Sequence, residues 1–192
     1  YLYKLPNLCW CKFGVFHKIH KQVEPIDPAI GIFHPPSLFT PQNLMQVILF
    51  IGIQATGKTT FYLNNFFRTH VHISLDQLNT RNKEAQFIDT CLSTQQAFVV
   101  DNTNPTRAER KGYIDKAKSR QFRVIAYYFQ SSLEQALMWN AQREGKARIP
   151  EIGIKGTYRK LELPSLDEGF DELYYVAYED NEWQVKTWDN EI

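Results

Sequence analysis

The stretch Gly52-Ile-Gln-Ala-Thr-Gly-Lys-Thr-Thr-Phe61, GIQATGKTTF, decides the fold because it matches the pattern G-x-x-x-x-G-K-[ST]. It follows the short apolar run QVILFI (46–51) and precedes a segment with helical apolar spacing (58–69). A glycine-rich loop between a strand and a helix turns backbone N–H groups inward, and the helix start adds the positive end of its dipole. The stretch therefore predicts a P-loop that binds the phosphates of a nucleoside triphosphate.

Each residue type in this loop suits phosphate chemistry. We expect Lys58 to place a positive charge on the β- and γ-phosphates and the Thr59 hydroxyl to ligate Mg²⁺, so ATP and Mg²⁺ are the predicted cofactors. Ala55 stands where many such loops have glycine, and a positive φ there would strain the loop slightly. The residues of the loop predicted to contact the nucleotide are Gly52, Ala55, Thr56, Gly57, Lys58, Thr59 and Thr60.

Strand and helix signals alternate along the rest of the chain. Apolar runs predict strands at 46–51, 70–74, 97–101 and 122–129, and helical spacing predicts helices at 58–69, 76–95 and 133–143. A further helix follows NTNP, either with Asn104 as cap before Pro105 or with Thr106 and Glu109 as a capping box. This alternation predicts an α/β P-loop NTPase fold of the adenylate-kinase-like type, a three-layer sandwich with a central parallel sheet and a short lid.

The N-terminal part differs in composition. Residues 1–45 hold a proline-rich stretch, EPIDPAIGIFHPPSLFTPQ, and are expected to form an extension or linker, with 46–192 as the P-loop domain. Cys9, Cys11, His17 and His20 offer metal-ligand types, but their spacing is tighter than that of structural zinc sites, which favours ordinary packed or surface residues. Three cysteines indicate a reducing compartment, hence the cytoplasm, and no apolar run is long enough to span a membrane. The oligomeric state stays open.

Charge is unevenly distributed, although the net charge is only +1. Residues 140–160 carry six basic side chains against two acidic ones, whereas residues 161–192 carry ten acids and one lysine. A basic window of this kind indicates a local anionic partner, and a solvated helix face is the alternative.

Asp101 ends the apolar run AFVVD, a pattern that in P-loop proteins places a carboxylate in the magnesium shell opposite Thr59. Hydrolytic ATPases commonly have glutamate at the next position, but Asn102 stands here, which favours a transferase. Alternatively, Asp101 and Asn102 only begin a turn.

Asp76 follows the second predicted strand, and ligands gather at the carboxyl ends of strands in a sheet of this kind. A carboxylate at this place can accept the proton of an attacking hydroxyl, so Asp76 is the candidate general base. Ser74 or Asp76 as a simple helix cap is the alternative.

The segment NAQREGKARIP (140–150) is polar and basic and lies between a predicted helix and Pro150. Such a segment is typical of a lid that closes over a nucleotide and neutralises charge on the transferring phosphoryl group. Arg143 is the first candidate for this role and Arg148 the second, and a solvated surface loop is the alternative.

Five blocks together resemble the kinase domain of polynucleotide kinases, in order and spacing over residues 46–176. They are GIQATGKTTF, HISLDQL, VVDNTNPTRAERKGYIDKAK, LEQALMWNAQRE and RIPEIGIKGTYRKLELPSLDEGF. The likeness is to the kinase half of polynucleotide kinase/phosphatase repair enzymes. A D-x-D-x-T phosphatase signature is absent from this sequence, and the lid has fewer arginines than in many relatives.

The resemblance implies transfer of the ATP γ-phosphate to the 5′-hydroxyl end of DNA or RNA. It assigns Asp76 as general base, Asp101 to the magnesium shell and Arg143 to the donor phosphates. It also implies a basic residue that contacts the acceptor's phosphate, for which Arg81 and Lys83 both qualify. Two alternatives stay open: a kinase of the same fold for a small-molecule hydroxyl, and a nucleotide-binding module without turnover.

Overall fold

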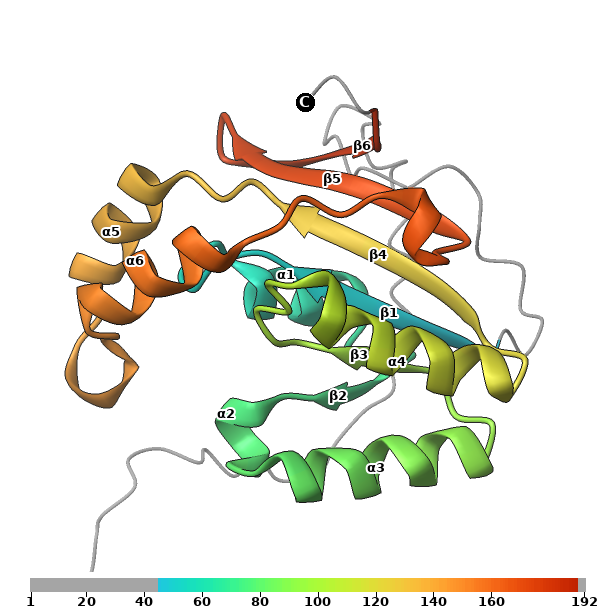
Figure 1. Ribbon diagram of the computed structural model, residues 1–192. Helices are drawn as coiled ribbons and strands as arrows, with labels where there is room; N and C mark the ends of the chain where they lie inside the picture. The colour runs from blue at the N-terminus through green and yellow to red at the C-terminus, as the bar shows by residue number, and fades with distance from the viewer. Residues whose placement is uncertain (1–44, 190–192) are drawn as a thin grey trace, which may run out of the picture. The chain divides into compact units, whose positions relative to one another are not determined.

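Six strands form a single sheet in the computed structural model, which describes residues 45–189. The spatial order is β2-β3-β1-β4-β5-β6, in which the first five strands are parallel and β6 is antiparallel to β5 (Figure 1). The strands are β1 (Gln46–Ile51), β2 (Val71–Ile73), β3 (Phe98–Val100), β4 (Arg123–Phe129), β5 (Glu172–Glu179) and β6 (Glu182–Thr187). The predicted parallel sheet is confirmed, with one antiparallel strand added at its edge.

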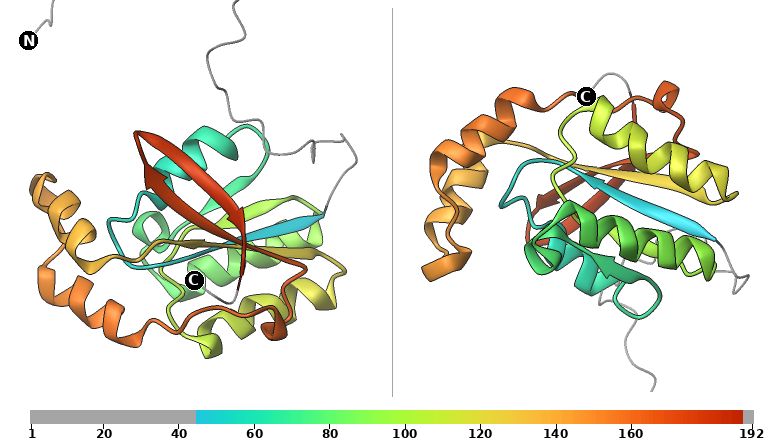
Figure 2. Two further views of the ribbon diagram at one scale, coloured as in Figure 1. Left: turned by 90° about the horizontal axis from the view of Figure 1, so that it is seen from above. Right: turned by 60° about the horizontal axis from the view of Figure 1, so that its bottom comes forward.

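Helices cover both faces of this sheet. The helix α1 lies on one face, and α3 and α4 lie on the other, whereas α5 and α6 lie beyond the carboxyl ends of β1 and β4 (Figures 1 and 2). Their bounds are α1 (Lys58–Asn65), α2 (Leu75–Leu78), α3 (Arg81–Ser93), α4 (Arg107–Ser119), α5 (Leu133–Ala141) and α6 (Glu151–Lys160), with the 3₁₀ turns η1 (Gly145–Ala147) and η2 (Leu166–Glu168). The α/β three-layer sandwich predicted from the sequence is therefore confirmed.

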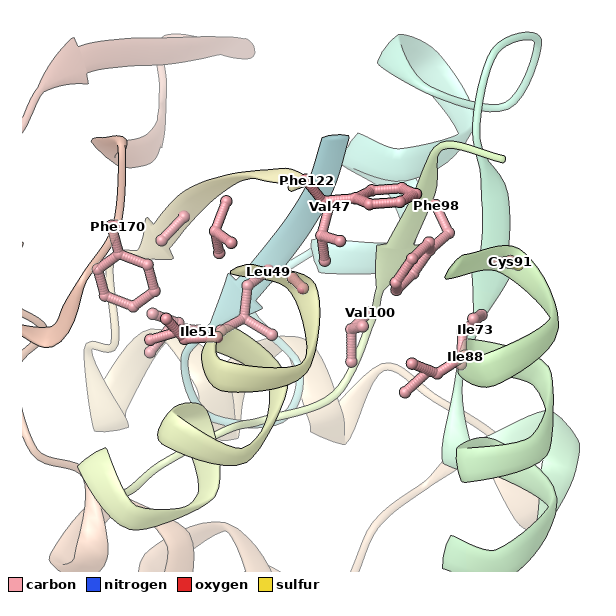
Figure 3. Packing of buried hydrophobic residues seen from close by; sticks show 14 of the residues in the cluster. Val47, Leu49, Ile51, Ile73, Ile88, Cys91, Phe98, Val100, Phe122 and Phe170 are labelled. Atoms are coloured by element: carbon pink, nitrogen blue, oxygen red, sulfur yellow. The ribbon is translucent and has the colours of Figure 1, made fainter. Parts of the chain in front are cut away.

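The central strand β1 is buried on both faces, which explains its continuous apolar sequence. Val47, Leu49 and Ile51 pack with residues of α3 and α4 on one face, and Figure 3 shows this cluster. Ile48 and Phe50 point to the opposite face and pack against the aromatic side chains of α1. Two cores on one strand fix its register, because a shift by one residue would exchange the two faces.

The helix predicted over 76–95 is interrupted. Asn79 adopts a left-handed conformation (φ 64°) and ends α2, and the Thr80 side chain then caps α3 by accepting a hydrogen bond from the Lys83 amide. Asparagine tolerates this conformation better than most residues, and threonine competes with the helix for backbone hydrogen bonds. Asp76 consequently lies on a separate short helix, capped by Ser74.

Other helix boundaries also differ slightly from the sequence prediction. Thr106 caps α4 by accepting from the Glu109 amide, so the second of the two predicted starts is the observed one. Asn104 has φ 43° and instead donates from its side chain to the Phe50 carbonyl at 2.7 Å. The helices α1 and α5 end four and two residues earlier than predicted, at Asn65 and Ala141.

The acidic C-terminal part forms the hairpin β5–β6. Its turn residues Asp180 and Asn181 both have positive φ, as a two-residue hairpin turn requires. Several acids just before and within β5 pair with basic side chains of α4 and β4: Glu168 with Arg110, Asp171 with Lys118, and Glu172 with Arg123. Part of the acidic charge of residues 161–192 is therefore paired inside the domain, with basic residues that lie outside the basic window 140–160.

The proposed linker character of residues 1–45 and the four possible metal ligands Cys9, Cys11, His17 and His20 lie outside the described residues, apart from Met45. Across residues 45–189 no helix combines the length and apolarity that crossing a membrane requires.

Candidate nucleotide and acceptor site

The P-loop connects β1 to α1 in a conformation set by three residues with positive φ. These are Gly52 (144°), Ala55 (60°) and Gly57 (83°). The Gly52 amide donates to the Thr103 carbonyl at 3.0 Å, which ties the loop to the segment after β3. Ala55 carries the positive φ that the sequence analysis considered, and its methyl group packs with Ile53 against α5 and α6.

Lys58 is buried at the start of α1, and its ammonium group turns back onto the loop. Nζ donates to the carbonyls of Gly52 (3.0 Å) and Ile53 (2.5 Å) and to the Thr56 hydroxyl (3.3 Å). Burial lowers the pKa of Lys58 to about 8, and the positive charge of Arg143 acts in the same direction. Burial disfavours the charged form of Lys58, so an incoming anion such as a phosphate would stabilise the ammonium group by pairing with it.

Thr59 and Asp101 meet where the P-loop and the end of β3 adjoin. The Thr59 hydroxyl donates to Asp101 Oδ2 at 2.6 Å, and His72 Nε2 lies 3.0 Å from the same oxygen. The His72 ring stacks on Tyr62 of α1, with 4.2 Å between ring centroids. A hydroxyl and a carboxylate fit the oxygen ligands that Mg²⁺ prefers.

In the part of the chain that the structure describes, no group of three or more His, Cys, Asp or Glu side chains could hold a metal by itself.

Asp76 lies in the first turn of α2, at the carboxyl end of β2, with its side chain exposed. It is close enough to Lys58 for its negative charge to raise the pKa of that lysine, as Asp101 also does. Ser74 is the residue that caps the helix, because its side chain accepts from the Asp76 amide at 3.3 Å. Ser74 is therefore the helix cap, and the Asp76 carboxylate is left exposed, near enough to Lys58 to act on it electrostatically.

The lid segment is anchored by a residue that the sequence analysis did not single out. Asn140 is buried, and its amide side chain both donates to the Ile149 carbonyl (2.7 Å) and accepts from the Ile149 amide (2.9 Å). This pairing closes the loop that contains η1. Arg143 is half-buried and acts electrostatically on Lys58, whereas Arg148 is exposed and its charge acts on Glu151. The structure thus brings Arg143, and not Arg148, to the cluster around Lys58.

A cavity of about 350 Å³ adjoins the P-loop on the side of α1 and the hairpin. Its lining includes Gly57, Thr60, Trp139, Arg143, Tyr178 and Trp183, and it is called the aromatic cavity below. Trp183 lies directly over Gly57, since a Cβ added to Gly57 would stand 2.5 Å from the indole. Flat aromatic walls beside a phosphate loop suit the base of a nucleotide.

The two candidates for acceptor binding differ in their surroundings. The Arg81 guanidinium donates through Nη1 to Glu84 (3.0 Å) and to the Tyr113 hydroxyl (2.7 Å). The Lys83 side chain is exposed, and the contact described for this residue is that of its backbone amide with Thr80. Among the contacts described for these two residues, side-chain hydrogen bonds to neighbours hold Arg81 in place, and none is described for the Lys83 side chain.

Four site residues escaped the sequence analysis: His72, Glu84, Asn140 and Trp183. For His72, its place inside the predicted strand HVHIS was a signal in the sequence, because a polar side chain in a strand beside an apolar core needs a partner. Glu84 and Asn140 are polar residues on the buried faces of their helices, a signal that helical spacing can show. Nothing local in the sequence indicates that Trp183 reaches the P-loop.

Comparisons with known proteins agree with this geometry. A model of an AAA domain matches residues 74–164. The bifunctional polynucleotide phosphatase/kinase of Schizosaccharomyces pombe is 25% identical over 85% of this chain and 44% of its own length. A putative bifunctional polynucleotide phosphatase/kinase of Acanthamoeba polyphaga mimivirus is 29% identical over 73% of this chain and 35% of its own length. The chain thus spans less than half the length of these curated relatives.

Among solved structures, Chaetomium thermophilum Kti12 in complex with ADP-AlF3 has a similar fold. Its TM-score is 0.56 at 17% identity, and the match covers 71% of this chain and 91% of that one. The sheet and the P-loop, together with these comparisons, show that the chain has the α/β fold of P-loop kinases. The chain is similar to these two curated polynucleotide phosphatase/kinases, in agreement with the resemblance seen in the sequence motifs.

Proposed function

We propose that this protein transfers the γ-phosphate of ATP to the 5′-hydroxyl end of a polynucleotide. The observation that carries the proposal is the convergence of Asp76, Lys58 and Asp101 at the carboxyl ends of β1, β2 and β3. An exposed carboxylate near a buried lysine at a P-loop suits a reaction in which the carboxylate takes the proton of an acceptor hydroxyl and the lysine holds the phosphate. The two curated relatives named as polynucleotide phosphatase/kinases support a polynucleotide as the acceptor.

The nucleotide would bind with its phosphates in the P-loop and its base in the aromatic cavity. Backbone N–H groups of the loop and the start of α1 offer donors and a positive dipole end to the β-phosphate. The Lys58 ammonium would leave the carbonyls of Gly52 and Ile53 for phosphate oxygens. Trp139, Tyr178 and Trp183 supply stacking faces for a base, and such contacts are tolerant of base identity because every base has a π-face.

Magnesium would be held by Thr59 and Asp101, whose oxygens already lie 2.6 Å apart. When bound, the ion neutralises negative charge on the β- and γ-phosphates. His72 contacts the same Asp101 oxygen at 3.0 Å and so restricts the orientation of the carboxylate. Asn102, in the place of a hydrolytic glutamate, supports transfer to a hydroxyl over hydrolysis by water.

Asp76 would accept the proton of the attacking hydroxyl, so that the new P–O bond forms while the bond to the β-phosphate oxygen breaks and ADP leaves. Lys58 and Arg143 would stabilise the charge on the transferring group. Arg81 or Lys83 would contact a phosphate of the acceptor strand. Basic side chains of α6 and the lid add a positive surface, on which Lys146, Arg148, Arg159 and Lys160 are exposed.

An acceptor panel tests the proposal. The protein is incubated with ATP and Mg²⁺, and either a 5′-hydroxyl oligonucleotide, the same oligonucleotide with a 5′-phosphate, or a set of sugars and polyols. We expect ADP release and a mass increase of one phosphate with the 5′-hydroxyl strand alone. ADP release driven by a sugar and by no oligonucleotide would replace the proposal with a small-molecule kinase. Nucleotide binding without turnover on any acceptor would indicate a silent binding module.

A further inference from the structure

We propose that Glu84 and Asn102 are positioning residues for the acceptor half of this site. They hold the backbone next to Asp76 and the guanidinium of Arg81, and so set where the acceptor end is placed. The proposal rests on the proposed function and assigns to it two residues whose described side-chain hydrogen bonds do not involve the P-loop.

Asn102 bridges two elements through its side-chain amide. Its Oδ1 accepts from the amide of Leu75 at 3.0 Å, and Leu75 is the first residue of α2, directly before Asp76. Its Nδ2 donates to Glu84 Oε1 at 2.5 Å. Asn102 is buried, so an amide with both ends engaged is held in one orientation. The start of α2 is thus tied to the end of β3.

Glu84 is the centre of the cluster, with only 3% of its surface exposed. Its carboxylate accepts from Asn102, from the Tyr113 hydroxyl at 3.1 Å and from Arg81 Nη1 at 3.0 Å. Burial, assisted by the negative charge of Glu84, raises the pKa of Tyr113 to about 12, so its hydroxyl remains a donor at neutral pH. Buried carboxylates of this kind require such donors, and each donor is thereby fixed.

The contacts of this cluster lead to the acceptor half of the site. The hydrogen bonds described for the Glu84 and Asn102 side chains join them to each other, to Leu75, to Arg81 and to Tyr113. None of these bonds, within residues 45–189, reaches the P-loop. The Arg81 side chain is 57% exposed, so an acceptor phosphate has access to it while Nη1 is held by Glu84. Disturbing the cluster should therefore affect the acceptor and leave nucleotide binding unchanged.

Exchanging the amide of Asn102 and the carboxylate of Glu84 tests whether this pair positions the acceptor half of the site. In Asn102→Asp two carboxylates oppose each other, so we expect kcat to fall by about 10- to 100-fold through misplacement of Asp76. The KM for the oligonucleotide should rise, while the Kd for ATP should stay within about twofold. In Asn102→Asp/Glu84→Gln the glutamine donates to the aspartate, the Leu75 amide keeps its acceptor, and most of the lost kcat should return.

A matched control is Asp89→Asn. Like the contact of Glu84 with Tyr113, the 2.7 Å ion pair of Asp89 with Lys116 joins α3 to α4, but it is exposed. This variant should leave all three kinetic quantities unchanged. Wild-type kinetics in Asn102→Asp, or no recovery in the double variant, would overturn the positioning role while the kinase function stands.

Hydrogen exchange of the Leu75 amide separates this failure from that of the proposed function. The amide should exchange faster in Asn102→Ala than in the wild type, because its acceptor is lost. Equal exchange rates would refute the positioning role whatever the activity. A wild-type protein that phosphorylates no oligonucleotide would instead refute the proposed function, and faster exchange in the variant would then still show that Asn102 holds α2.

Discussion

The Thr59 hydroxyl donates a 2.6 Å hydrogen bond to the Asp101 carboxylate, joining the start of α1 to the end of β3. Because both oxygens are the proposed magnesium ligands, Asp101→Asn should raise the Mg²⁺ concentration for half-maximal activity by about 10- to 100-fold. Titration of transfer rate against Mg²⁺ measures this effect, and chelation with EDTA should stop the reaction.

Asp167→Asn is the control for this prediction, since Asp167 is an exposed carboxylate paired with Arg107 on the surface. It should leave the Mg²⁺ dependence unchanged. The magnesium assignment is wrong if Asp101→Asn and Asp167→Asn give the same titration curve.

Lys58 makes ATP affinity dependent on pH. Its pKa is about 8, below the usual lysine value, mainly because of burial. The triphosphate favours the charged lysine, so above pH 8 binding must be accompanied by proton uptake. The Kd for ATP should then rise by about tenfold per pH unit between pH 8 and pH 10. Calorimetric titration at several pH values measures the Kd.

The same pKa has a consequence for folding. Between pH 8 and the pKa of lysine in an unfolded chain, the unfolded state binds more protons, so the contribution of Lys58 to stability increases with pH in this interval.

The control for the pH dependence of ATP affinity is Lys58→Arg. Arginine keeps its charge throughout, so the Kd of this variant for ATP should not change with pH. A wild-type Kd that is constant from pH 7 to pH 10 would disprove the perturbed lysine.

Two features require glycine at position 57: its backbone conformation and the neighbouring Trp183 side chain. It has φ 83°, and a Cβ at this position would lie 2.5 Å from the Trp183 indole. Gly57→Ala should therefore lower the free energy of unfolding by at least about 1–2 kcal/mol and weaken ATP binding. Chemical denaturation and nucleotide titration measure the two effects.

Combining Gly57→Ala with Trp183→Ala separates the two causes, with Trp183→Ala alone as the reference because the indole also packs against Phe61, Phe129 and Tyr178. Gly57→Ala should destabilise the Trp183→Ala protein less than the wild type, since the collision is gone but the unfavourable backbone conformation remains. No remaining effect would show that the indole alone requires glycine, and an undiminished effect would show that the collision contributes nothing.

Local sequence patterns were sufficient to predict the P-loop, four of the strands and the grouping of Lys58, Asp76 and Asp101. These predictions depend on neighbouring residues and on the rule that parallel strands end at one edge. The break at Asn79 was missed because apolar spacing continues through it. The Glu84–Asn102–Tyr113 cluster joins three distant segments, and tertiary packing alone brings them together. The same is true of Trp183 and Gly57.

Arg110 is expected to be important for stability and not for catalysis. Its side chain is fully buried, forms a fork with Glu168 at 2.7 Å through two nitrogens, and donates to the carbonyls of Asn104, Pro105 and Glu162. Arg110→Ala should cost about 3–5 kcal/mol, because it removes the closest cation from the nearly buried Glu168 carboxylate, leaving Arg107 at 3.8 Å, and takes a donor away from three carbonyls. Urea denaturation measures this loss.

The neighbouring Lys111 provides the control, because its pair with Asp115 on the same helix is exposed. Lys111→Ala should change stability by less than about 1 kcal/mol. Equal effects of the two substitutions would contradict the structural role of Arg110.

The most direct test of the account is transfer of labelled γ-phosphate from ATP to 5′-hydroxyl DNA and RNA by the wild type and by Asp76→Asn. We predict labelled strands with the wild type and a loss of about 10²- to 10⁴-fold in kcat with Asp76→Asn, at nearly unchanged ATP affinity. No label on either strand with the wild type, or full activity in Asp76→Asn, would contradict it.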